Sequence, residues 1–110
     1  MTDEQRTRSQ AVSAVFKALG HPSRVFIAET LRDGERCVCE LSELIGADMS
    51  TVSRHLSVLR RAGIVSDRKV GTTVYYSLAC GCLGQMRSGV ENILRMQAEE
   101  QDSVLQSMKK

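Results

Sequence analysis

Two short helical segments flank a very short connection, and this pairing limits the fold more than any other feature of the chain. Gly46 ends the first segment and Gly63 ends the second. Ser50 is the expected N-cap of the second helix. Residues 40–62 therefore predict a helix-turn-helix. The apolar positions with helical spacing in the two segments are Leu41, Leu44, Ile45, Val52, Leu56 and Leu59.

Elements on both sides of this motif can be read from the same periodicities. Apolar spacing predicts a helix that ends near Leu19, a helix over 23–31 and a last helix from Leu83 onward. β-branched and aromatic runs at both ends of 64–78 surround a charged stretch centred on Gly71, which predicts a hairpin. The expected fold class is α+β and mostly helical: a winged helix-turn-helix of about five helices and a β-hairpin wing.

The size of the chain sets the domain organisation. At 110 residues it should form one domain over 1–110, with a core of aliphatic residues because only 4% of residues are aromatic. The last helix has heptad character, which so small a domain buries best against a second copy of itself. We therefore expect a homodimer that pairs through 5–19 and 83–105.

Composition also restricts where the protein works and what it does. No apolar run is long enough to cross a bilayer and the polar N-terminus lacks a signal-peptide core, so we expect a cytoplasmic protein with no membrane partner. Thiols stay reduced in that compartment, which favours ligand or sensor roles for the four cysteines over a disulfide framework. Apart from the cysteines, no set of nucleophile and base is visible, so we expect no enzyme activity.

The second helix of the motif offers a polar face that suits double-stranded DNA. In a helix-turn-helix this helix enters the major groove, where hydroxyl side chains meet phosphates and longer polar side chains reach base edges. The charges agree, because residues 54–69 carry five Arg or Lys and one Asp. The expected DNA-binding residues are Ser50, Thr51, Ser53, Arg54, His55, Ser57, Arg60, Arg61, Arg68 and Lys69. His21, before Pro22, is expected to be a structural histidine instead.

The four cysteines form two Cys-x-Cys pairs, Cys37 with Cys39 and Cys80 with Cys82. Residues two apart share a face only in extended chain, so each pair should lie where a strand meets a helix. The pairs are interpreted as metal ligands for a soft ion: As(III) or Sb(III), with Cd(II), Pb(II) or Zn(II) as further candidates. A reversible dithiol sensor for oxidants or sulfide species and a structural zinc site remain alternatives.

Three motifs in the same order resemble the ArsR/SmtB family of metalloregulatory repressors, over roughly residues 11–95. They are residues 19–24 (LGHPSR), residues 50–56 with Leu59 and 62–63, and Gly71 with 74–78. The resemblance implies a dimer that binds operator DNA without effector and leaves it when the effector binds.

The family resemblance also bears on the cysteines. Residues 37–41 (CVCEL) are similar to the arsenic-binding box of ArsR proteins, whereas Cys80 and Cys82 depart from its simplest form. By analogy with the winged-helix fold, the short strand before the third helix should pair with the outgoing hairpin strand and bring Cys37 close to Leu78 and Cys80. Zinc or nickel sensing on the last helix is disfavoured because that helix contains no His.

Overall fold

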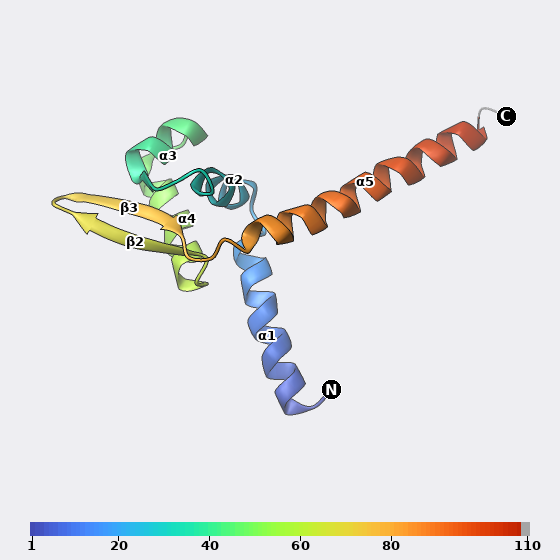
Figure 1. The fold of residues 1–110 in the computed structure, drawn as a ribbon, viewed down its shortest axis with the longest axis horizontal. Coiled ribbons are helices and arrows are strands. Elements are labelled where there is room, and N and C mark those ends of the chain that lie inside the picture. The colour runs from blue at the N-terminus through green and yellow to red at the C-terminus, as the bar shows by residue number, and fades with distance from the viewer. Residues whose placement is uncertain (109–110) are drawn as a thin grey trace. The chain divides into compact units, whose positions relative to one another are not determined.

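The computed structural model describes residues 1–108 and confirms the expected winged helix-turn-helix (Figure 1). This range holds five helices and three strands. In chain order they are α1 (Asp3–Ala18), α2 (Pro22–Leu31), β1 (Arg36–Cys37), α3 (Val38–Ile45), α4 (Met49–Arg61), β2 (Val65–Val70), β3 (Thr73–Leu78) and α5 (Leu83–Met108). The chain divides into two compact units, Met1–Cys80 and Gly81–Lys110.

The core of the first unit is where α2, α3 and α4 pack together. Its fully buried side chains come from all three helices: Ile27, Leu41, Val52, Leu56 and Leu59 are each 0% exposed. The three residues from α4 recur at the spacing of one helix face, so burying that face fixes which side of α4 remains outside. No polar or charged residue of the described chain is buried.

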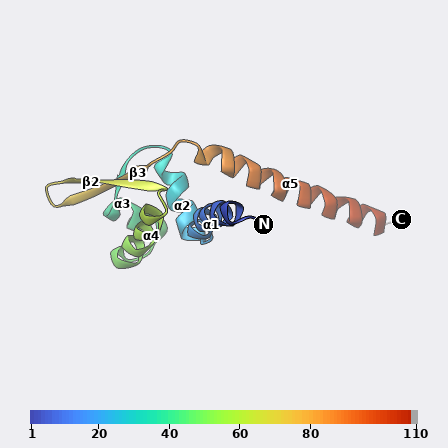
Figure 2. The same ribbon diagram turned by 90° about the horizontal axis from the view of Figure 1, so that it is seen from below.

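The three strands form one antiparallel sheet in the order β1-β3-β2. Figure 2 shows the sheet nearly edge-on, with α4 on one side of it. Val70 pairs with Thr73, so the hairpin turn contains only two residues. The first of them, Gly71, has a φ of 63°, a left-handed conformation that a tight hairpin requires and that glycine adopts without steric cost. The wing predicted over 64–78 therefore closes at Gly71.

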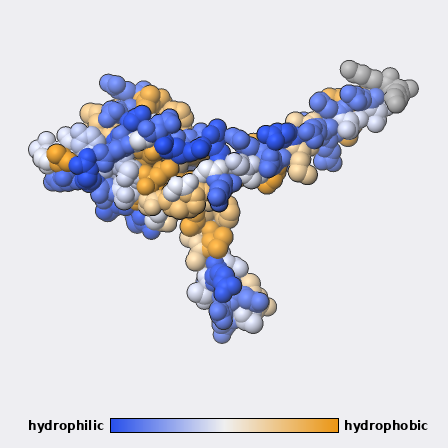
Figure 3. Space-filling view, in the orientation of Figure 1, coloured by the Kyte–Doolittle hydropathy of each residue, from blue (hydrophilic) through white to orange (hydrophobic). Residues whose placement is uncertain are grey.

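Helix α1 leaves apolar side chains uncovered. Val12 is 51% exposed and Phe16 is 57% exposed, although both lie on the side that the sequence pattern marks as apolar. Figure 3 shows hydrophobic surface along this helix. The apolar side of α1 is therefore about half open to solvent in the single chain.

The second unit is described by itself, because it consists of α5 and the residues that lead into it. None of the residues of α5 that the structure describes is buried. Its exposed apolar side chains include Val90, Ile93, Leu94, Val104 and Leu105. Across residues 1–108, no helix combines the length and apolar character needed to cross a membrane.

Candidate nucleic-acid interface and thiol site

The start of α4 differs from the sequence expectation. Asp48, and not Ser50, is the N-cap, and the helix begins at Met49. The Asp48 carboxylate accepts hydrogen bonds from the backbone N–H of Thr51 at 2.7 Å and from Oγ of Ser50 at 3.1 Å. A carboxylate is the stronger acceptor and also complements the positive end of the helix dipole, which explains the choice. The same bonds, led by that from the Thr51 backbone, lower the pKa of Asp48.

Most of the predicted DNA-contacting side chains lie on the outer side of α4. Ser50, Ser53, Arg54, Arg60 and Arg61 are exposed, and Thr51 and Ser57 are half-buried. This distribution follows from the helical period, because Val52, Leu56 and Leu59 take the inner side. The helix therefore offers hydroxyl and guanidinium groups to a groove, as the sequence predicted, and their contacts with DNA stay a prediction.

His55 has a neighbour that the sequence did not indicate. Its ring centroid lies 4.5 Å from that of His21, and the side chain is half-buried. Burial, and then the charges of His21, Arg24 and Arg54, lower the pKa of His55. His21 itself caps α2, where its Nδ1 accepts from the backbone N–H of Ser23 at 3.1 Å, which confirms its structural role. The His21 ring therefore packs against His55, and burial favours the neutral form of the His55 imidazole.

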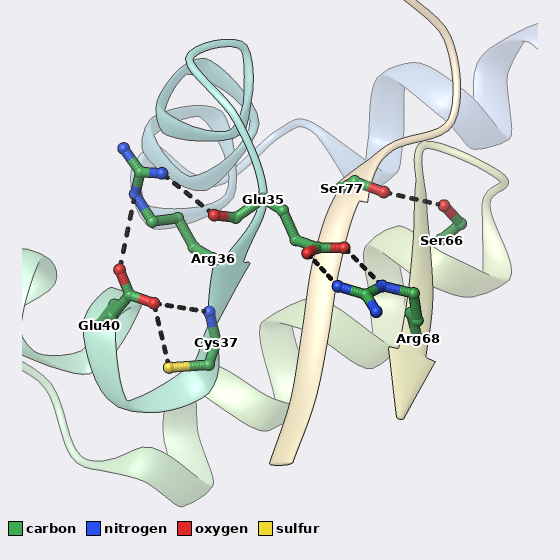
Figure 4. Close-up of polar contacts among 7 residues, drawn as sticks. All are labelled: Glu35, Arg36, Cys37, Glu40, Ser66, Arg68 and Ser77. Atoms are coloured by element: carbon green, nitrogen blue, oxygen red, sulfur yellow. Dashed lines mark hydrogen bonds and ion pairs between the residues drawn. The ribbon is translucent and has the colours of Figure 1, made fainter. Parts of the chain in front are cut away.

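Two of the expected phosphate-binding cations are already paired with carboxylates. Arg68 on β2 binds Glu35 through two hydrogen bonds of 2.6 and 3.1 Å (Figure 4). Its guanidinium also lies 5.5 Å from the centre of the Tyr75 ring. This bidentate contact lowers the pKa of Glu35. Arg60 reaches Asp67 at 3.4 Å. The remaining cations of the predicted set, which form no ion pair within residues 1–108, are Arg54, Arg61 and Lys69.

The first cysteine pair lies at the junction of β1 and α3, as the sequence predicted. Cys37 is the N-cap of α3, and its Sγ donates to Oε1 of Glu40 at 3.2 Å (Figure 4). The same carboxylate accepts the backbone N–H of Cys37 at 3.3 Å, and Arg36 lies 3.9 Å from its other oxygen. These contacts, led by the thiol, lower the pKa of Glu40. The Cys37 thiol therefore has an acceptor for its proton at the helix start.

Cys39 faces a second sulfur atom. This exposed thiol lies on the first turn of α3, and its Sγ is 3.9 Å from Sδ of Met49, the first residue of α4. The contact bridges the two helices of the helix-turn-helix. No pattern in the sequence singled out Met49.

The two cysteine pairs differ in the structure. Cys37 and Cys39 are free thiols, whereas Cys80 and Cys82 are disulfide-bonded, contrary to the expectation of four reduced cysteines. Strand β1 pairs with β3 as expected, but Cys37 lies opposite Tyr75. Because the strands are antiparallel, residues after Cys37 run toward Thr73 and away from Leu78, which is about 10 Å along the strand from Tyr75. The expected approach of Cys37 to Leu78 and Cys80 was therefore wrong.

This register bears on the proposed ligand set. Within residues 1–108, no three His, Cys, Asp or Glu side chains are grouped so as to hold a metal ion. The ligand roles of the four cysteines stay a prediction. Two acidic residues that the sequence analysis did not single out contact predicted site residues: Glu40 bonds to Cys37, and Glu35 bonds to Arg68. The sequence could have indicated Glu40, since an acid three residues after an N-cap is typical of a capping box. No local pattern marks Glu35.

Comparison with known sequences places these features among bacterial regulators. Residues 21–67 match the sequence profile described as "Bacterial regulatory protein, arsR family". The uncharacterized HTH-type transcriptional regulator Rv0081 of Mycobacterium tuberculosis is 35% identical over 86% of this chain and 83% of its own length. A CadC homolog of Staphylococcus aureus, a cadmium resistance regulator, is 47% identical over 61% of this chain and 56% of its own length. The arsenic resistance regulator ArsR1 of Pseudomonas putida is 45% identical over 58% of this chain and 51% of its own.

Solved structures agree with these relatives. The winged helix-turn-helix domain of Mb0332 from Mycobacterium bovis, described as homodimeric, has a TM-score of 0.78 at 28% identity, covering 91% of this chain and 93% of that domain. The crystal structure of Rv0081 has a TM-score of 0.74 at 29% identity, covering 92% and 98% of the two chains. The Mb0332 domain is described as a possible ArsR-family transcriptional regulator, and Rv0081 as an HTH-type transcriptional regulator.

Proposed function

From the premise that this chain belongs to the ArsR/SmtB family of winged helix-turn-helix transcriptional repressors, we propose that As(III) or Sb(III) releases it from operator DNA by binding Cys37 and Cys39. One observation carries the proposal: two free thiols stand at the start of α3, the helix that leads directly into the DNA-reading helix α4. Metal-responsive relatives support a soft effector, since one is named for arsenic resistance and another for cadmium resistance.

The proposed DNA-bound form is a homodimer. The uncovered apolar residues of α1, together with those of α5, give each helix a face that a second copy would bury. The homodimeric Mb0332 domain supports the same arrangement. Each protomer would place α4 in one major groove, with Arg54, Arg61 and Lys69 free to neutralise phosphates. Arg60 and Arg68 would act mainly on Asp67 and Glu35.

The effector would act through groups that already hold the junction together. A thiol must lose its proton to bind a metalloid, so Cys37 would give up its contact with Glu40, which also holds the first backbone N–H of the junction. Strain at this helix start is then passed to α4 across the short turn at 46–48. A few kcal/mol of difference between the two states is sufficient for a switch.

The test is a fluorescence-anisotropy titration of duplex DNA from the promoter region of the gene, with reduced protein and with added arsenite, antimonite, cadmium or peroxide. We expect arsenite and antimonite to release the DNA. Cys37→Ser and Cys39→Ser should bind DNA as the parent does and fail to respond. The matched control is Cys80→Ser with Cys82→Ser. Normal arsenite release by both single variants would overturn the proposal.

A second candidate function is a thiol switch, favoured by the disulfide-bonded state of Cys80 and Cys82. In this case a peroxide would take two electrons from two thiolates as the disulfide forms, with water as the reduced product. Peroxide would then change DNA affinity, and a dithiol reductant would restore it. Release by peroxide alone, lost in the Cys80→Ser, Cys82→Ser variant, would select this function over metalloid sensing.

A further inference from the structure

The contact between Cys39 and Met49 joins two soft ligand atoms from consecutive helices. Cys39 is exposed and Met49 is 50% exposed, so an ion can reach both from solvent. Thiolate and thioether sulfur together are the donor set that selects copper(I) and related soft monovalent ions. Cys37, two residues before Cys39, supplies a further thiol at the same helix start.

The separation of the two sulfur atoms suits a shared ion. At a bond length of about 2.3 Å, that of a zinc–thiolate bond, sulfurs that lie 3.9 Å apart subtend an angle of about 116° at the ion. This is close to the angle between ligands in three-coordinate, trigonal geometry. Cys39 and Met49 would therefore need little movement to bind, whereas Cys37 would have to leave Glu40 to become the third ligand.

Charge near the two sulfur atoms also favours a cation over a neutral effector. Glu40 follows Cys39 and Asp48 precedes Met49, so an acidic residue stands beside each of the two sulfur-bearing residues. The segment 33–48 carries five acidic residues against one Arg. A thioether has no proton to lose, so its binding adds no charge of its own and suits an ion of charge +1.

We propose that Cys39 and Met49, with Cys37, form a binding site for a soft monovalent cation, copper(I) or silver(I), that ties the start of α3 to the first residue of α4. This inference rests on the proposed function in that both effectors share Cys37 and Cys39. Met49 is the first residue of α4, so an ion bound to it would act directly on the DNA-reading helix. Arsenite, which would bind the two thiols, does not need this contact.

The probe is silver(I), added to protein in which Cys80 and Cys82 are replaced by Ser so that only two thiols remain. With methionine methyl groups labelled with ¹³C, we expect the resonance of Met49 to shift and those of the other four methionines to stay. Met49→Leu, which keeps the side-chain volume, should weaken silver binding by about tenfold or more, as loss of a ligand or its support does. Met108→Leu is the matched control, because Met108 is also exposed.

Two results would overturn the site: an unmoved Met49 methyl resonance at saturating silver, or unchanged silver affinity of Met49→Leu. The arsenite assay separates this inference from the proposed function. Met49→Leu should still leave DNA on addition of arsenite, since the metalloid uses the two thiols. If arsenite releases neither protein while silver shifts the Met49 resonance, the proposed function fails and the silver site stands.

Discussion

Salt should weaken operator binding through a small set of cations, and two neighbouring residues of the wing test which cations belong to it. Lys69 forms no ion pair within residues 1–108, whereas Arg68 is held by Glu35 through bonds of 2.6 and 3.1 Å. Only a cation that neutralises a phosphate releases counterions from DNA. Lys69→Ala should therefore flatten the salt dependence, and Arg68→Ala should leave it nearly unchanged.

The size of the effect follows from the number of unpaired cations. Arg54, Arg61 and Lys69 provide three per protomer and six per dimer, and a slope of about −0.9 per phosphate predicts about −5.4 for log K against log salt. Affinity should then fall about 2000-fold between 50 and 200 mM salt. Lys69→Ala removes two cations per dimer, so the slope becomes less steep, at about −3.6. The loss of DNA affinity over the same salt range then falls to about 150-fold.

The assay is fluorescence anisotropy with one labelled operator duplex at four or more salt concentrations. Glu35→Gln is the informative partner variant, because it frees Arg68 and should steepen the slope toward about −7. Equal flattening by Arg68→Ala and Lys69→Ala would refute the reasoning, since it would mean that Arg68 leaves Glu35 for a phosphate in the complex.

Two further predictions concern stability. Leu56→Ala should lower the free energy of unfolding, measured by urea titration, by about 3–5 kcal/mol, because the side chain is 0% exposed in the core. The control Leu44→Ala, at 55% exposure, should lower it by less than about 1 kcal/mol. Equal losses in the two variants would contradict this packing. The pair of Glu35 with Arg68 lowers the pKa of Glu35 from its ordinary value of 4.5, so its contribution to stability is full above that value and is lost as pH falls through the lowered pKa. The difference in unfolding free energy between the parent and Glu35→Gln should accordingly shrink below pH 4.5, and a difference that stays constant from pH 7 to pH 3 would show that the pair does not stabilise the fold.

Local patterns in the chain were sufficient to predict the helices, the hairpin and the face of α4 that turns outward. The reason is physical: helix and strand periods act over a few residues, and burying Val52, Leu56 and Leu59 forces the remaining side chains of α4 to the surface. The N-cap was misplaced by two residues because Asp48 and Ser50 are both good caps; in the structure the Asp48 carboxylate accepts the Thr51 backbone N–H, and the Ser50 hydroxyl donates to the same carboxylate.

Contacts between distant segments had no such signal. The bond between Glu35 and Arg68 joins residues 33 apart, and it exists because strand pairing sets β1 and β2 on either side of β3. Strand register likewise turned Cys37 away from Leu78, and packing of α3 on α4 brought Cys39 to Met49. Residue spacing defines which side chains share an element, whereas the partner that each one meets depends on how the elements pack.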